Sequence, residues 1–162
     1  MYVKGGVNMS KNMYYFAYGS NMDVKRLEER LGRAVTVKAA GRLQRDALRF
    51  NKVASGNPRE GYANIVEGLG EEVWGVVYEV TEEDLEQLNV YEGVAGGHYY
   101  RKKVSVELED GTVVEAVTYV AFPERVEEGL KPRREYLEHL LAARDILPDW
   151  YVRRLEETET LD

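Results

Sequence analysis

The chain has 162 residues, a length that suits one domain with a single sizeable core. Hydrophobic residues make up 44% and charged residues 31%, which is typical of a folded globular protein and excludes a disordered chain. There is no cysteine, which excludes disulfides, a thiolate nucleophile and zinc–thiolate sites. No stretch approaches the roughly 18 apolar residues that cross a bilayer. We therefore expect a cytoplasmic protein with no membrane partner.

The formal net charge is −7, and it is unevenly distributed along the chain. Residues 1–60 hold 12 Lys and Arg against 5 Asp and Glu, whereas residues 61–162 hold 10 against 24. An acidic protein is a poor candidate for nucleic-acid binding, so we expect no nucleic-acid partner. Two interpretations of the basic first third stay open. It favours a small anionic substrate, or its cations pair with the acidic remainder, which is the commoner arrangement.

The chain is expected to form a loose lead-in over residues 1–12, one domain over residues 13–157 and a loose tail over residues 158–162. Residues 14–18 form a short aromatic run, which predicts a buried strand. A helical pattern starts at Asp23, with apolar residues three or four apart, and Gly32 can close that helix. The first predicted unit is therefore a strand, a tight turn and a helix N-terminus.

The middle of the chain is rich in predicted strands. Apolar runs place them at residues 35–43, 47–50, 62–66 and 73–80. The Gly- and Pro-containing segment 55–61 reads as a loop. Thr81 is a good N-cap, and the acids that follow it suit the first turn of a helix that ends near Glu92.

The last part of the chain changes from strands to helices. Alternation predicts a strand over residues 99–107, Glu109-Asp110-Gly111 is a hairpin signal, and residues 113–121 form the returning strand. Helical spacing follows near residues 133–144, and Pro148 can open a final helix over residues 149–157. Strands followed by helices indicate an α+β fold with an antiparallel or mixed sheet curled into a β-barrel.

The segment Tyr18-Gly19-Ser20-Asn21 is the strongest local candidate for a binding site. A strand that turns at glycine into a helix directs free backbone N–H groups and the positive end of the helix dipole into one space, which binds carboxylate or phosphate. The alternative is an ordinary N-cap, which looks the same in sequence. The Gly-Lys-Ser/Thr ending of a Walker loop is absent, and Met22 stands where a nucleophile elbow needs its last glycine.

The second candidate is Glu92, at the end of a predicted helix and followed by glycines and aromatics. In a partly apolar pocket, desolvation would raise the pKa of this carboxyl group toward neutrality and suit it to proton transfer. The alternative is an ordinary acid among 29. His98 and His139 lack metal-ligand spacing, so we expect no metal site; His98 can line a pocket, and His139 is expected at the surface or partly packed.

These segments together resemble the gamma-glutamylcyclotransferase family, also called the AIG2-like group, from about Tyr14 to Leu155. The resemblance rests on four motifs in the same order and spacing: residues 15–22, Arg42-Leu43-Gln44 with Leu48 and Phe50, residues 72–78, and Glu92-Gly93-Val94 with Gly97 and Tyr99. The ending, Tyr136 followed by Leu147-Pro148 with Tyr151 and Leu155, is similar to the true gamma-glutamylcyclotransferases.

The resemblance implies a compact β-barrel flanked by helices, a possible homodimer, and conversion of γ-glutamyl amides to 5-oxoproline without a cofactor. It implies that Glu92 is the catalytic acid/base. The residues that would bind the γ-glutamyl substrate are Tyr18, Gly19, Ser20, Asn21, Tyr99, Tyr119 and Tyr136. Tyr99 would support Glu92 or the substrate through its hydroxyl group. The alternatives are a small-anion binding or regulatory module with little turnover, and an amidohydrolase that uses water in the same cavity. Relatives of this fold act on free γ-glutamyl amino acids, glutathione, γ-glutamyl-lysine or a biosynthetic intermediate, so the identity of the leaving amine stays open.

Overall fold

The computed structural model describes residues 12–162, so the lead-in expected over residues 1–12 lies outside the described residues except for Asn12. The chain forms strands, α-helices and short 3₁₀ helices (η) in this order: β2 (Met13–Ala17), η1 (Ser20–Met22), α1 (Val24–Leu31), β3 (Thr36–Val53), β4 (Gly61–Val80), α2 (Glu82–Tyr91), β5 (Tyr99–Leu108), β6 (Val113–Ala121), η2 (Pro123–Arg125), α3 (Arg134–Leu141), η3 (Arg144–Ile146) and α4 (Asp149–Glu156).

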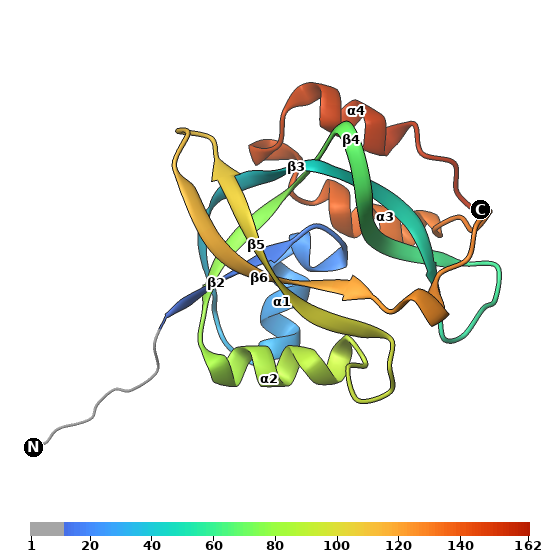
Figure 1. The fold of residues 1–162 in the computed structure, drawn as a ribbon, viewed down its shortest axis with the longest axis horizontal. Coiled ribbons are helices and arrows are strands. Elements are labelled where there is room, and N and C mark those ends of the chain that lie inside the picture. Colours follow the sequence, from blue (N-terminus) through green and yellow to red (C-terminus); the bar gives the residue numbers. More distant parts are fainter. Residues whose placement is uncertain (1–11) are drawn as a thin grey trace, which may run out of the picture.

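The five strands close into a barrel in the order β2-β4-β3-β5-β6 (Figure 1). Neighbouring strands are antiparallel, except that β2 and β6 are parallel and meet at Tyr15 and Val117. The contact between β2 and β6 closes the barrel by joining the first and last strands of this order. The predicted α+β class, with a small mixed β-barrel flanked by helices, is confirmed.

Two long strands replace four shorter predicted ones. The prediction of separate strands at residues 35–43 and 47–50 was wrong, because β3 runs on through a bulge between Gln44 and Asp46. The prediction of a break between residues 66 and 73 was wrong in the same way, since β4 continues past Gly70. Arg45 and Gly70 both have positive φ, 69° and 82°. Polar residues at this bulge interrupt the apolar pattern without ending the strand pairing.

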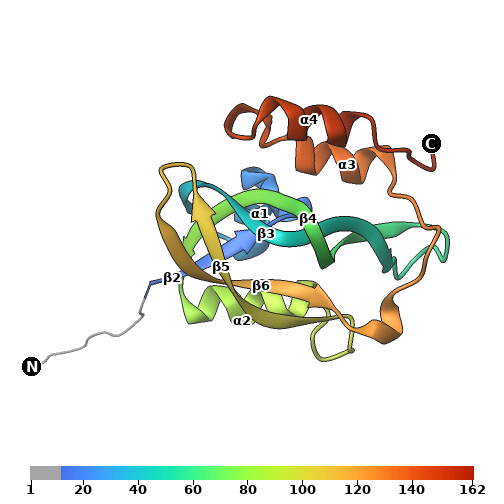
Figure 2. The same ribbon diagram turned by 45° about the horizontal axis from the view of Figure 1, so that its top comes forward.

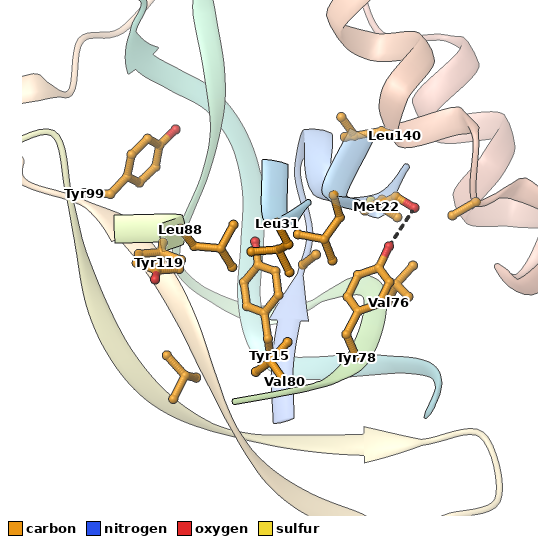
Figure 3. Packing of buried hydrophobic residues seen from close by; sticks show 14 of the residues in the cluster. Tyr15, Met22, Leu31, Val76, Tyr78, Val80, Leu88, Tyr99, Tyr119 and Leu140 are labelled. Carbon is orange, nitrogen blue, oxygen red and sulfur yellow. Dashed lines mark hydrogen bonds between the residues drawn. The ribbon is translucent and has the colours of Figure 1, made fainter. Parts of the chain in front are cut away.

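The strands are buried on both faces, which explains why β2 is apolar and aromatic along its whole length. One set of side chains, including Phe16 and Val77, packs mainly with other strand residues, together with Tyr18 and with Tyr136 of α3. The alternate set, including Tyr15 and Tyr78, packs with side chains from all four α-helices. Figure 3 shows this second core, with Tyr78 donating a hydrogen bond to the Met22 carbonyl oxygen at 3.3 Å.

The helices cover the barrel on two sides. Figure 2 shows α3 and α4 stacked together on one side and α2 on the opposite side. Helix α1 begins at the Asp23 cap and ends at Gly32, in the left-handed conformation, as predicted. Thr81 caps α2 and exchanges hydrogen bonds with Asp84 in a capping box. These caps fix where α1 and α2 begin. They thereby help to position the residues next to each helix.

The C-terminal helices are shorter than predicted. Helix α3 stops at Leu141, before a 3₁₀ turn, and α4 begins after Pro148, as expected. The segment 158–162, expected to be loose, carries no helix or strand. Its backbone nevertheless contacts the chain ahead of α3, because the Leu161 N–H donates to the Pro132 carbonyl oxygen at 3.0 Å.

Gly75 of β4 should be intolerant of any side chain. A Cβ atom there would lie 2.3 Å from the Ala17 carbonyl oxygen and 2.9 Å from the Phe16 ring. Gly75→Ala must therefore push β2 away from β4, and we expect it to lower the free energy of unfolding by about 2 kcal/mol or more, measured by urea denaturation. Gly56→Ala is the matched control, since nothing lies within 4 Å of its Cβ position. Equal stability of the two variants would contradict the tight β2–β4 packing.

Candidate active site

A cavity of about 420 Å³ opens at one end of the barrel. Its walls come from all five strands, from η1 and α1, from the end of α2 with the turn that follows it, and from α3. The side chains and backbone that line it include all eight residues that the sequence assigned to catalysis and binding: Tyr18, Gly19, Ser20, Asn21, Glu92, Tyr99, Tyr119 and Tyr136. Segments more than 100 residues apart in sequence, such as those of Tyr18 and Tyr119, thus meet in one cavity.

The turn after β2 brings backbone donors to the wall of this cavity. Within residues 12–162, the N–H groups of Gly19, Ser20 and Asn21 donate to no other protein atom, because η1 starts here and its first N–H groups have no partner inside the helix. Gly19 is closely packed, since a Cβ atom there would lie 3.1 Å from the Tyr136 hydroxyl oxygen and 3.2 Å from the Ala63 Cβ. Since residues 19–21 line the cavity and their N–H groups have no protein acceptor, these groups can bind a small anion there.

The side chains of Ser20 and Asn21 hold arginines of α1 rather than projecting free donors. Arg26 Nε donates to Ser20 Oγ at 3.1 Å, and Arg30 Nη1 donates to Asn21 Oδ1 at 3.1 Å. The buried Asn21 amide also donates to the Tyr15 hydroxyl oxygen at 3.0 Å. The loop therefore offers an anion its backbone N–H groups and two guanidinium groups that its side chains orient.

Glu92 follows directly after the last residue of α2 and points into the cavity. Its side chain is 16% exposed, and its Oε2 lies 3.8 Å from Arg30 Nη1. Burial raises the pKa of this carboxyl group to about 7, against the opposing attraction of Arg30, Lys52 and Arg26. The C-terminal end of α2 is also the negative end of a helix dipole, which adds to the cost of ionisation. Glu92 can therefore exchange a proton near neutral pH.

Three cations from the basic first third of the chain, Arg26, Arg30 and Lys52, line the cavity. Others from the same segment pair with acids elsewhere: Arg33 with Asp84, Arg42 with Glu72 and Glu107, and Arg49 with Glu71. Both interpretations of the basic segment therefore apply, each to different residues.

The four predicted tyrosines lie at the cavity, but their hydroxyl groups bond to the protein. Tyr18 donates to the Tyr119 carbonyl oxygen, and Tyr99 donates to the Ala63 carbonyl oxygen at 2.8 Å rather than to Glu92. The Tyr119 hydroxyl lies 2.7 Å from Asn89 Oδ1 on α2. The Tyr136 hydroxyl accepts from the Ala63 N–H at 3.0 Å. These rings shape and rigidify the cavity, and burial raises the pKa of each hydroxyl group, so all four stay neutral.

The sequence did not single out Arg26, Arg30, Lys52 or Tyr62 as site residues. Arg26 and Arg30 are spaced by four on the helix that follows the glycine turn, which places them on one face beside the turn; that spacing was an available signal. His139, expected at the surface or partly packed, is 26% exposed in its side chain and lines the cavity. Its Nδ1 lies 2.9 Å from Asp23 Oδ2, and its Nε2 lies 3.4 Å from Arg26 Nη1.

A bulge in β3 accounts for the position of Lys52. The pairing of β3 with β4 shifts between Arg49 and Lys52, and such a shift rotates the following side chains relative to the sheet. Buried amides secure the distorted segment, because Asn64 Nδ2 donates to Asn51 Oδ1 at 3.0 Å and Asn64 Oδ1 accepts from the Ala121 N–H at 2.9 Å. No sequence pattern predicts this bulge, so the position of Lys52 in the site could not be predicted from the sequence.

No group of three or more His, Asp or Glu side chains in residues 12–162 is arranged to hold a metal ion. Across the same part of the chain, every helix is too short or too polar to cross a membrane.

Comparison with known proteins assigns the family. The model of the AIG2-like family matches residues 72–155. A gamma-glutamylcyclotransferase from Bos taurus is 32% identical over 162 residues, covering 94% of this chain and 81% of the relative. This chain belongs to the gamma-glutamylcyclotransferase family. A solved structure named gamma-glutamyl cyclotransferase superposes with a TM-score of 0.84 at 29% identity, covering 94% of this chain and 90% of that one. The chain is thus an enzyme of the gamma-glutamylcyclotransferase type.

The buried Glu92 should make stability depend on pH. Its folded-state pKa, about 7, lies above the ordinary value of 4.5, so the native state binds the extra proton between these values. Stability from this group therefore falls as pH rises from about 4.5 to 7, with a full cost of up to ~3 kcal/mol above that range. We expect Glu92→Gln to unfold at higher urea concentration than the wild type at pH 8 and at the same concentration at pH 4.

Glu86→Gln is the matched control, because Glu86 is an exposed acid on the same helix. Removing it should leave the difference between pH 4 and pH 8 unchanged. A Glu92→Gln variant with the pH dependence of the wild type would contradict the raised pKa.

Proposed function

We propose that this enzyme cyclises the γ-glutamyl part of its substrate to 5-oxoproline and releases the amine that was bound to it. The observation that carries the proposal is a carboxyl group with a pKa near 7, Glu92, in the same cavity as an anion-binding turn and two arginines. The names of the relatives from Bos taurus and Homo sapiens support the same activity.

The α-carboxylate of the γ-glutamyl group would bind at the Tyr18–Asn21 turn. The N–H groups of Gly19, Ser20 and Asn21 have no other protein partner, and the guanidinium groups of Arg26 and Arg30 are tied to the side chains of this turn. Charge-assisted hydrogen bonds of this kind are short and directional. They would fix one end of the substrate and leave its α-nitrogen and γ-carbonyl group to fold toward each other near Glu92.

The reaction moves two protons. The substrate's α-ammonium group must lose one before its nitrogen can attack the γ-carbonyl carbon, and a second once the new C–N bond has formed. The leaving nitrogen gains both as the old amide bond breaks, and departs as an ammonium group. Glu92 would accept each proton and return it, which requires a carboxyl group that is neither fully ionised nor fully protonated at neutral pH.

The cavity supplies the remaining catalytic effect by positioning. Attack within one molecule to close a five-membered ring has a large proximity advantage once the reacting atoms are aligned. The tyrosine rings support this role, since the Tyr136 ring stacks on Tyr62 at 5.0 Å between centroids and its hydroxyl group is held by Ala63. The walls of the cavity are therefore rigid where the substrate would have to bend.

A direct test uses a panel of γ-glutamyl amides and detects 5-oxoproline by mass spectrometry. We expect product with the wild type and a fall in kcat of at least about 1,000-fold with Glu92→Gln, because the neutral amide cannot carry a proton. Glu86→Gln is the matched control and should retain full activity, since Glu86 is exposed on the same helix. Release of 5-oxoproline at the wild-type rate by Glu92→Gln would show that another group is the base.

A further inference from the structure

The guanidinium group of Arg26 is held by neutral acceptors. Its Nε donates to Ser20 Oγ at 3.1 Å, and its Nη1 lies 3.4 Å from His139 Nε2. Other arginines of the basic segment, such as Arg33 and Arg42, pair directly with carboxylates, whereas Arg26 forms no ion pair within residues 12–162. A neutral acceptor orients a guanidinium group without cancelling its charge, so Arg26 stays available to an anion in the cavity.

A carboxylate lies behind this imidazole. His139 Nδ1 lies 2.9 Å from Oδ2 of Asp23, the residue that caps α1. An ionised carboxylate only accepts hydrogen bonds, and a guanidinium group only donates them. The two contacts therefore assign the tautomer of His139: its hydrogen lies on Nδ1 and faces Asp23, and Nε2 accepts from Arg26. Asp23 thus acts on Arg26 through a neutral ring rather than by a direct ion pair.

Helix α3 places the imidazole beside the turn. Tyr136 and His139 are three residues apart on this helix, so they lie on the same face. That face is closely packed against the turn, because a Cβ atom at Gly19 would lie 3.1 Å from the Tyr136 hydroxyl oxygen. Figure 2 shows α3 covering the barrel together with α4. The position of His139 is therefore set by the packing of α3 and not by Arg26 alone.

Arg26 needs such support to stay at the turn. Burial, and the charge of Arg30 four residues further along α1, lower the pKa of Arg26, which shows that its charge is in an unfavourable environment. A long side chain that is repelled by its neighbour keeps one position only if acceptors hold it. Ser20 provides one acceptor at Nε, and His139 provides a second at Nη1.

We propose that Asp23 and His139 position Arg26, so that its guanidinium group meets the α-carboxylate of the substrate in a fixed orientation and without a competing carboxylate. The inference rests on the proposed function, which places that α-carboxylate at the turn. Asp23 and His139 are positioning residues, because they act through Arg26 and move no proton in the reaction. The ordering of the Arg26 side chain would then precede binding, and this favours affinity.

The first test measures kcat and KM with γ-glutamyl-alanine. His139→Ala removes an acceptor of Arg26, and we expect it to raise KM about 10-fold while kcat changes less than about twofold, as for one hydrogen bond to a charged group that acts in binding. His139→Gln should stay close to the wild-type KM, because its amide oxygen can accept in place of Nε2. The matched control, Glu138→Ala, removes an exposed side chain of α3 and should leave both constants unchanged.

A double-mutant cycle separates positioning from a purely structural role of His139. If His139 acts through Arg26, His139→Ala should have no further effect on KM in the Arg26→Met background. The same increase in KM in both backgrounds would overturn the inference, and so would an unchanged KM in His139→Ala.

The tautomer of His139 gives a test in the wild type, which needs no variant to be active. The chain has two histidines, and the ¹⁵N NMR signals of His139 are assigned by their loss in His139→Gln. At pH 8 we expect hydrogen on Nδ1 and none on Nε2, and hydrogen on Nε2 would overturn the inference.

Failure of the proposed function is distinguishable from failure of this inference. If the wild type forms no 5-oxoproline, the proposed function fails. Calorimetric binding of γ-glutamyl-alanine then replaces KM as the measurement: weaker binding to His139→Ala than to the wild type supports the positioning role, whereas equal binding, or none to either protein, overturns it.

Discussion

The site depends on a conflict between desolvation and charge at one carboxyl group. Glu92 is removed from water at the end of α2, which disfavours its ionised form, while Arg30, Lys52 and Arg26 favour that form. Desolvation has the larger effect on the pKa of Glu92, but the cations reduce the rise that it causes. The result is a pKa of about 7 rather than the much higher value expected of an isolated buried acid. A carboxyl group in this state can both take and give a proton, and the arrangement of the fold around it serves to keep that balance.

The barrel produces this balance by joining distant segments. Closure brings residues of all five strands to one cavity, including the bulged end of β3, and helices α1, α2 and α3 supply the rest of the wall. The tight β2–β4 contact at Gly75 involves Phe16 and Ala17, the residues directly before the Tyr18–Asn21 turn. The Asn51–Asn64 amide pair secures the bulge that presents Lys52. Loss of any of these contacts would change the positions of the charged groups around Glu92, although Glu92 itself would be unaltered.

Much of this arrangement could be predicted from the sequence, because its signals are local. The aromatic strand, the glycine turn, the capped helices and the 109–111 hairpin each depend on neighbouring residues, and the structure has all of them. The lengths of β3 and β4 could not be predicted, because their bulges depend on pairing between strands. The Tyr18–Asn21 turn and Glu92 were singled out chiefly through the family resemblance, since an N-cap and one acid among 29 carry little information alone.

The cations of the site were missed for a different physical reason. Lys and Arg usually lie at the surface, so a buried lysine is recognised only when the surrounding fold is known. Arg26 and Arg30 gain their role from Ser20 and Asn21, which present acceptors to them only after η1 and α1 have formed. His139 likewise reaches the cavity because α3 packs against η1, an arrangement of segments separated by more than 100 residues.

The most direct test of the account is a pH titration of the Glu92 side-chain carboxyl carbon by NMR, with the signal assigned by its loss in Glu92→Gln. We expect a midpoint near pH 7, with the folded protein intact throughout the titration. A midpoint near 4.5, the ordinary value for a glutamate, would mean that the carboxyl group is solvated and that its environment does not prepare it for proton transfer.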